Sequence, residues 1–187
     1  MPRKKLDGPV ADLLKETFME IYAGKRLNEI SVKEICAEAG IARTTFYNYF
    51  FDVYDLLEKI ENELLRDLER LNSDFMTVDM QDLISGELHY YDQTMDYIWE
   101  HKAWFRTLLD KDRDSPFVYQ WKQTIKQTFR DKFHYEHYDF QSEELILEVV
   151  ASVSIGMYTY WVNTSEPVSK ETISQEVILK CFRAFLS

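Results

Sequence analysis

The sequence contains few of the residues that interrupt helices or cross-link a chain. It has five glycines and four prolines among 187 residues, so long helices are easy to build. Its two cysteines, Cys36 and Cys181, lie far apart and show neither a disulfide framework nor a zinc-binding spacing. A hydrophobic content of 45% and an aromatic content of 15% are enough for a sizeable core. A helical protein stabilised by its core is therefore expected.

Membrane and secretion signals are also missing. No uninterrupted apolar run reaches 18 residues, the length at which a membrane-spanning helix becomes a candidate. The first residues, MPRKKLDG, lack the apolar segment of a signal peptide. We therefore expect no membrane association and a cytoplasmic protein.

Motifs for catalysis and cofactor binding are absent as well. The sequence has no glycine-rich phosphate loop, no HExxH and no nucleophile motif. His134 and His137 have a helical i, i+3 spacing with Glu136 between them, but no third metal ligand accompanies them, and a solvated helix end is the better interpretation. We expect no enzyme activity, no metal and no cofactor.

Acidic residues outnumber basic ones, and the excess is unevenly distributed. The net charge is −11. Residues 1–50 hold eight Lys/Arg and seven Asp/Glu, whereas residues 51–187 hold fourteen and twenty-six. A near-neutral amino-terminal segment can approach phosphates while the acidic remainder stays away from them. The asymmetry fits a protein of two parts, one of which contacts nucleic acid.

The stretch SVKEICAEAGIARTTFYNYFFDVYDLL, residues 31–57, predicts two short helices joined by a tight turn and followed by a longer helix. Ser31 and Glu34 have the spacing of a capping box, in which the carboxylate reaches back to the first residue. Gly40 follows the first helix, where a left-handed backbone ends it, and Ile41 is the apolar plug of the turn. The first helix has one apolar face, formed by Val32, Ile35, Cys36 and Ala39.

The second short helix, expected from Ala42 to Tyr49, has two different faces. Phe46 and Phe50 are four residues apart and face the core. Arginine can form two hydrogen bonds to guanine in the major groove, and tyrosine and asparagine reach phosphates. The pattern favours a DNA-reading helix, and the alternative is an ordinary helical hairpin with half-buried aromatic residues. The outward-facing residues are Arg43, Thr44, Thr45, Tyr47, Asn48 and Tyr49.

These residues resemble the amino-terminal DNA-binding domain of TetR/AcrR-type transcription regulators. The resemblance covers roughly residues 7–60: a leading helix from Val10 to Gly24, then ISVKEICAEAGIARTTFYNYF, then DLLEKI. It implies that the helix from Ala42 to Tyr49 enters the major groove. By this resemblance the side chains near base edges are Arg43, Thr44 and Tyr47, and those near phosphates are Thr45, Asn48 and Tyr49.

One departure from the family pattern lies at the start of the next helix. Family members often have a phosphate-binding lysine there, whereas this chain has Val53, preceded by Phe51 and the helix-capping Asp52. We expect this lysine contact to be missing, so that either the affinity for the DNA backbone is modest or the basic amino terminus, Arg3 to Lys5, supplies such contacts. The expected DNA-binding set is Ser31, Arg43, Thr44, Thr45, Tyr47, Asn48, Tyr49, Lys4 and Lys5.

Past residue 50 the hydrophobic pattern is helical, without strand alternation of useful length. We predict an all-α fold of about nine helices. Residues 1–51 would form a helix-turn-helix DNA-binding domain, and residues 52–187 a helical regulatory and dimerisation domain. The helices expected in the second domain cover residues 53–71, 80–104, 105–109, 115–137, 143–163 and about 169–186, with a looser stretch at 72–79.

The last two expected helices carry apolar stripes. Ser152 and Gly156 are small and four apart, which lets another helix come close. TetR-type proteins pair through two such helices in a four-helix bundle, and one short reading helix alone contacts too few bases for useful specificity. The alternative is that both stripes are internal core. The expected dimer interface comprises Val149, Val153, Gly156, Met157, Tyr160, Val177 and Cys181.

The middle helices are rich in aromatic residues, most of which we assign to the core. Some could line a pocket for a small-molecule effector, because pockets in helical bundles form between helices. The candidate pocket residues are His89, Tyr90, Trp99, Trp104 and Trp121.

Together these features favour a ligand-responsive repressor that binds a palindromic double-stranded DNA operator as a homodimer. The region from about Val149 to Phe185 also resembles the carboxy-terminal domains of a TetR subgroup that includes dihydroxyacetone-kinase-operon activators. An activator that works with a protein co-regulator is therefore the alternative within the family. A helical enzyme or an interaction module without a DNA role is the alternative outside it.

Overall fold

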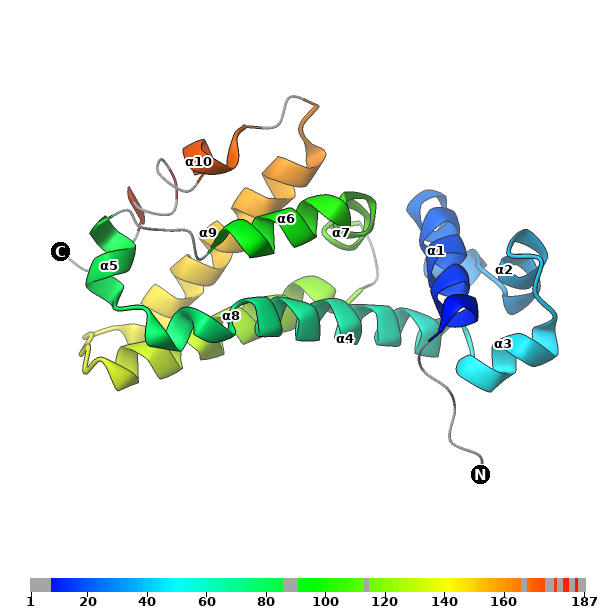
Figure 1. Cartoon of the computed structure of the whole chain (residues 1–187), viewed down its shortest axis with the longest axis horizontal. Helices are drawn as coiled ribbons and strands as arrows, with labels where there is room; N and C mark the ends of the chain where they lie inside the picture. Colours follow the sequence, from blue (N-terminus) through cyan, green and yellow to red (C-terminus); the bar gives the residue numbers. More distant parts are fainter. Residues whose placement is uncertain are drawn as a thin grey trace. The chain divides into compact units, whose positions relative to one another are not determined.

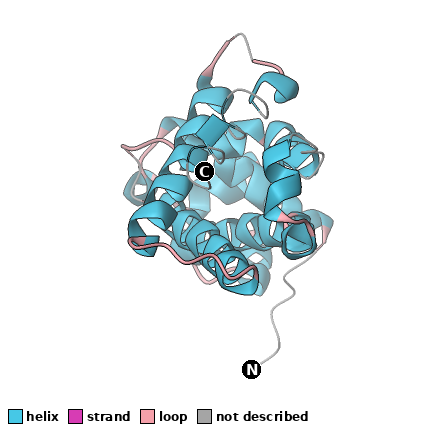
Figure 2. Ribbon diagram, turned by 90° about the vertical axis from the view of Figure 1, so that its left-hand side faces the viewer, coloured by secondary structure: helices cyan, strands magenta, loops and turns pink. Residues whose placement is uncertain are grey.

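The computed structural model describes residues 8–85, 91–112, 115–165 and 168–173, together with residues 177, 180, 181 and 184 (Figure 1). All regular secondary structure in these segments is helical, and Figure 2 shows helices joined by loops. The prediction of an all-α fold is confirmed.

The chain divides into two compact units. Unit 1 comprises Met1–Leu65 and Lys111–Asp114, and unit 2 comprises Arg66–Asp110 and Ser115–Ser187. This division runs through one helix, α4 (Val53–Leu71). The functional boundary expected after residue 51 stays a prediction.

Unit 1 is built around a core of aromatic and aliphatic side chains. Phe18 and Tyr22 stack with ring centroids 5.4 Å apart, and both rings are fully buried. Lys15 is also buried, and its ammonium group pairs with Asp12 on its own helix and with Glu63 on α4. The helices of unit 1 are α1 (Pro9–Gly24), the 3-10 helix η1 (Leu27–Glu29), α2 (Val32–Glu38), α3 (Arg43–Tyr49) and the first part of α4.

Unit 2 is a helical bundle in which α9 is central. Both α7 and α8 pack against α9, and α6 packs against α7. The ring of Trp121 on α8 packs against those of Phe105 and Tyr158, with centroid distances of 5.5 Å and 5.2 Å. The helices of unit 2 are the end of α4, η2 (Ser73–Thr77), α5 (Met80–Ser85), α6 (Asp92–Glu100), α7 (Lys102–Leu108), α8 (Phe117–Tyr135), α9 (Glu143–Asn163) and α10 (Lys170–Thr172).

The segment expected as a single helix from Met80 to Trp104 is divided in the structure. α6 ends at Glu100 and α7 begins at Lys102, with His101 at the junction. Neither proline nor glycine marks this junction, and the helical spacing of apolar residues continues across it, so the sequence pattern does not reveal the break. The last expected helix, residues 169–186, lies partly outside the described residues, which show α10 at its start and helical backbone again at residues 180, 181 and 184.

α9 is strongly apolar, although the sequence contains no continuous apolar run of 18 residues. It is long and apolar enough to cross a membrane by length and composition, with a mean hydropathy of 1.5 over its most apolar window, of which 33% is buried. The core helix of a globular protein meets the same criterion. Its scattered Ser, Thr and Gly residues explain why no continuous run appears in the sequence.

Candidate DNA-binding surface, cavity and pairing face

Contacts at the two ends of α2 define the helix that precedes the turn into α3. The hydroxyl of Ser31 accepts a hydrogen bond from the backbone amide of Glu34, with an N···O distance of 3.2 Å, and so caps α2. The second half of the expected capping box is wrong, because the Glu34 carboxylate pairs with Lys25 instead of reaching back. Gly40 has φ +66°, the left-handed conformation that ends α2. These contacts set the entry of the chain into α3.

α3 has a buried side and an exposed side. Phe46 is completely buried, and its ring lies 5.5 Å from that of the equally buried Phe50. Tyr47, the next residue, is 44% exposed. Of the expected DNA-binding side chains on α3, Arg43, Thr44, Tyr47 and Asn48 are exposed, and Thr45 and Tyr49 are half-buried; Ser31, before α2, is exposed as well. Lys4 and Lys5 lie outside the described residues.

The joint between α3 and α4 is held by a group of hydrogen bonds. Asp52 caps α4 by accepting from the Asp55 amide at 2.8 Å, and the Asp55 carboxylate accepts from the Phe51 amide at 2.6 Å. The ammonium group of Lys59 binds both the Asp55 carboxylate, at 2.9 Å, and the backbone carbonyl of Tyr49, at 3.1 Å. Sequence reasoning did not single out Lys59, although its i, i+4 spacing from Asp55 was a usable signal.

Aromatic side chains are exposed where the family lysine is missing. Val53 is buried in the core, whereas the neighbouring Phe51 and Tyr54 are exposed. The Lys59 ammonium group lies 5.8 Å from the Phe51 ring centroid. The surface beside α3 is therefore aromatic as well as polar.

Unit 2 contains a cavity of about 60 Å³ between its helices. Glu69 is the one charged residue among the described residues that line it. Burial raises the pKa of the Tyr158 hydroxyl, and burial together with the neighbouring Tyr158 raises the pKa of Tyr91, so both tyrosines are neutral at physiological pH. The lining residues with hydroxyl groups are Tyr91, Thr94, Thr124, Thr128, Ser154 and Tyr158.

The expected pocket residues do not lie together. Trp121 lines the cavity. Trp99 lines a different hollow of about 210 Å³, where its ring lies 5.2 Å from that of Trp161. Trp104 contacts the His101 ring at 5.9 Å and lines neither space. His89 and Tyr90 lie outside the described residues. The threonines and the serine of the cavity were not among the expected residues, because a hydroxyl residue on a helix gives no sign in the sequence of whether it faces a cavity.

One face of α9 leaves apolar side chains uncovered. Leu145 and Tyr160 are each 63% exposed, although they lie at opposite ends of the helix. Gly156 is exposed between them, and a Cβ atom placed there would meet no heavy atom within 4 Å. The remaining expected interface residues are half-buried: Val149, Val153, Met157, Val177 and Cys181.

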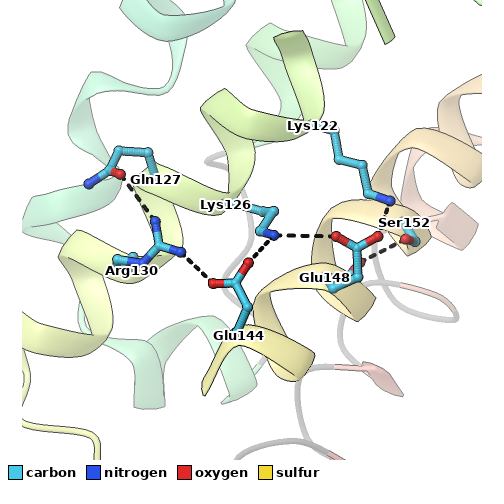
Figure 3. A network of polar contacts seen from close by, with 7 residues as sticks. All are labelled: Lys122, Lys126, Gln127, Arg130, Glu144, Glu148 and Ser152. Carbon is cyan, nitrogen blue, oxygen red and sulfur yellow. Dashed lines mark hydrogen bonds and ion pairs between the residues drawn. The ribbon is translucent and has the colours of Figure 1, made fainter. Parts of the chain in front are cut away.

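Charged side chains tie α8 to α9 (Figure 3). Lys126 pairs with both Glu144 and Glu148, while Lys122 binds Glu148 and Arg130 binds Glu144. The hydrogen bond from Lys126 holds the pKa of Glu144 below its usual value, and the bond from Lys122 does the same for Glu148. The hydrogen bond to Glu144 in turn raises the pKa of Lys126. The network keeps opposite charges together on one side of the bundle.

His134 and His137 lie at the carboxy-terminal end of α8. His134 contacts Glu143 at 3.0 Å, and His137 has a positive φ of 61° just past the end of α8. Within the part of the chain that the structure describes, no group of three or more His, Cys, Asp or Glu side chains could hold a metal ion.

Comparisons with known proteins agree with this arrangement. Residues 88–179 match a family described as the transcriptional regulator C-terminal region. The chain is 22% identical over 173 residues to the uncharacterized HTH-type transcriptional regulator YxbF of Bacillus subtilis, covering 88% of this chain and 42% of that protein. It is 28% identical over 120 residues to DhaS, the HTH-type dhaKLM operon transcriptional activator of Lactococcus lactis, covering 64% of this chain and 60% of DhaS. The chain thus spans about half the length of these relatives.

A solved structure has the same fold. The TetR-family transcriptional regulator from Streptomyces coelicolor superimposes with a TM-score of 0.60 at 18% identity, over 95% of this chain and 80% of that one. Both relatives are named as HTH-type transcriptional regulators, and the matched family describes the carboxy-terminal region of such regulators. The fold is therefore the one found in a TetR-family regulator, and the proteins to which the chain is similar include the activator DhaS.

Proposed function

We propose that this chain is a cytoplasmic, ligand-responsive repressor that binds a palindromic operator as a homodimer. The exposed side of α3 is the observation that carries the DNA-binding part of the proposal. Arg43, Thr44 and Tyr47 share that side, and Phe46 on the opposite side anchors the helix in the core of unit 1. A helix held in this way can enter the major groove and offer arginine and hydroxyl groups to base edges.

Backbone contacts complete the proposed DNA interface. Thr45, Asn48 and Tyr49 are assigned to phosphates, together with Ser31 at the start of α2 and Lys4 and Lys5. Phosphate contacts fix the position of a protein on the duplex without reading its sequence. The hydroxyl of Ser31 already accepts a bond from Glu34, and its proton remains available for a phosphate oxygen.

The homodimer is proposed to form through the exposed face of α9 and the segment that follows it. Leu145 and Tyr160 would be covered by the partner, and Gly156 would allow two helices to approach closely. Covering this face would also account for the high hydropathy of α9 without a membrane.

The effector is proposed to bind in the cavity of unit 2. Leu68 and Glu69, both on α4, form part of its wall, and the same helix begins directly after α3. Binding could shift DNA affinity only through a difference in effector affinity between two states of the protein.

A gel shift tests the DNA-binding proposal. The full chain is titrated onto the duplex upstream of its own gene and onto a scrambled duplex of equal length. We expect a salt-sensitive complex with the upstream duplex that survives excess competitor, and we expect Arg43→Ala to weaken it by about 1–3 kcal/mol. Equal affinity for both duplexes would contradict sequence-specific binding.

An activator that works with a protein co-regulator is the second candidate. The observation that favours it is the relative DhaS, whose name describes a transcriptional activator. Transcription in vitro from the bound promoter separates the candidates: a repressor lowers the transcript when the chain alone is added. An activator raises it, either alone or after addition of a co-regulator.

A further inference from the structure

Tyr158 is a buried tyrosine whose hydroxyl has no hydrogen-bond partner among the described residues. The residue is 5% exposed and lines the cavity of unit 2. Its ring stacks on Trp121 with an interplanar angle of 14°, which fixes its position. A hydroxyl that faces a cavity can form its hydrogen bonds to water or to a bound molecule. A molecule in the cavity could supply the missing partner.

Hydroxyl groups from three helices present acceptor atoms around the same cavity. Ser154 on α9 donates its proton to the Val150 carbonyl at 3.0 Å, and Thr128 on α8 donates to the Thr124 carbonyl at 3.0 Å. The Thr94 hydroxyl on α6 donates to the side-chain oxygen of Asn72 at 3.1 Å. Each hydroxyl has a single proton, so these oxygens can only accept from a further group. A guest that carries hydrogen-bond donors suits this lining.

The charge of the lining argues against anions. No lysine, arginine or histidine occurs among the described residues around the cavity, and Glu69 is acidic. A carboxylate or phosphate that loses its water here would find no cation to pair with, which is strongly unfavourable. Tyr91 and Tyr158 are neutral, so they contribute no charge to the lining.

The size of the cavity limits the guest. Its volume is about 60 Å³. An apolar cavity of about 150 Å³ accommodates benzene, so a compact molecule with fewer non-hydrogen atoms than benzene is suitable here.

We propose that this cavity binds a small uncharged molecule with hydroxyl donors, such as a short diol, and rejects carboxylates of the same size. Tyr158 supplies the specific polar contact, and Trp121 supplies an apolar wall. The inference deepens the proposed function, on which it rests for its regulatory meaning, because it names the chemical class of the effector.

Methyl NMR on the full chain tests the proposal directly. The probes are propane-1,2-diol and lactate, which share one carbon skeleton and differ in a hydroxymethyl group versus a carboxylate. Ile125 lines the cavity, and Ile35 in the core of unit 1 serves as an internal control. We expect the diol to shift the Ile125 methyl signal saturably and leave Ile35 unchanged, and we expect lactate to shift neither.

Three variants show that the signal comes from this site. Tyr158→Phe removes only the hydroxyl and should weaken diol binding by about three- to tenfold. Tyr119→Phe alters an exposed tyrosine on α8 and should leave diol binding unchanged. Ser154→Leu fills the cavity and should abolish the saturable shift, which also excludes a bulk solvent effect.

Three results would overturn the proposal: lactate binding as tightly as the diol, no saturable shift of Ile125, or a Tyr158→Phe variant with wild-type affinity. The DNA gel shift keeps the two hypotheses apart. A chain that binds DNA specifically but gives no Ile125 shift refutes the effector class and leaves the regulator intact. A chain that binds the diol but no DNA refutes the proposed regulator and leaves the diol site intact.

Discussion

Lys59 on α4 donates a hydrogen bond to the backbone carbonyl of Tyr49, the last residue of α3, with an N···O distance of 3.1 Å. Carbonyl groups in the last turn of a helix have no partner within that helix. The lysine therefore satisfies the end of α3 and connects it to α4. The Asp55 carboxylate, 2.9 Å from the same ammonium group, holds the lysine in place.

We expect Lys59→Met to weaken specific DNA binding by about two- to tenfold, because α3 loses a contact that fixes its orientation. The cost in stability should be only about 0.5–1 kcal/mol, since the ion pair is partly exposed. Titration calorimetry with the operator and thermal unfolding measure the two effects. Lys111→Met removes the same charge from an exposed lysine and is the control. Equal losses in both variants would indicate general electrostatics instead of positioning.

The two sides of α3 should respond to substitution in opposite ways. Tyr47→Ala is expected to weaken operator binding by about 1–3 kcal/mol with little change in melting temperature, because the side chain is exposed. Phe46→Ala is expected to lower the free energy of unfolding by about 3–5 kcal/mol, because the ring is fully buried. Gel shifts and chemical denaturation distinguish these outcomes. The reverse pattern would show that the faces are assigned incorrectly.

Gly156→Leu should weaken dimerisation without unfolding the chain. The position is helical and exposed in the single chain, and a Cβ atom there meets no heavy atom within 4 Å, so we expect the chain to tolerate the substitution. In a closely packed pair of helices the added side chain would separate the partners, and we expect the dissociation constant to rise by at least about tenfold. Sedimentation equilibrium measures it. Gly24→Leu, at the end of α1 and equally open, is the matched control and should leave the constant unchanged.

Acid should weaken the junction between α8 and α9. The pKa values of Glu144 and Glu148 lie below the ordinary 4.5 in the folded protein, chiefly through bonds to Lys126 and Lys122 respectively. In the unfolded chain both pKa values return to normal, so the unfolded state binds protons first as the pH falls. The stabilisation is therefore present at neutral pH and is lost as the pH drops through the folded-state values.

The measurement is melting temperature between about pH 7 and about pH 3. The double variant Glu144→Gln/Glu148→Gln should start lower at neutral pH and lose less on acidification than the wild-type chain. Glu20→Gln/Glu38→Gln changes the charge equally at two exposed positions and should follow the wild-type slope. A double variant at residues 144 and 148 that runs parallel to the wild type would contradict the role of the network.

Local signals in the sequence predicted much of the fold. The helix expected at residues 143–163 is α9 with the same bounds, because acidic residues and a Thr-Ser-Glu-Pro break flank an apolar segment. Gly40 and Asp52 were identified from their local chemistry, and both have the expected conformation or hydrogen bond. Phe46 was assigned to the core by its spacing from Phe50, and both are buried.

Features that depend on tertiary contacts could not be predicted in this way. Glu34 has the correct spacing for a capping box, but Lys25 competes for its carboxylate from the preceding loop. The cavity around Tyr158 is formed by residues of α4, α6, α8 and α9, which only packing brings together. Trp99 and Trp121 look equivalent in the sequence but line different spaces.

Selection from a pool of random DNA duplexes tests the central claim most directly. The full chain is used to enrich bound duplexes over several rounds, and the enriched sequences are aligned. A homodimer that places two α3 helices on one duplex predicts an inverted repeat whose half-sites lie about 10 base pairs, or a multiple of one helical turn, apart. Arg43→Ala should relax the preference within each half-site. Enrichment of an asymmetric site by a monomer, or of no sequence at all, would contradict the account.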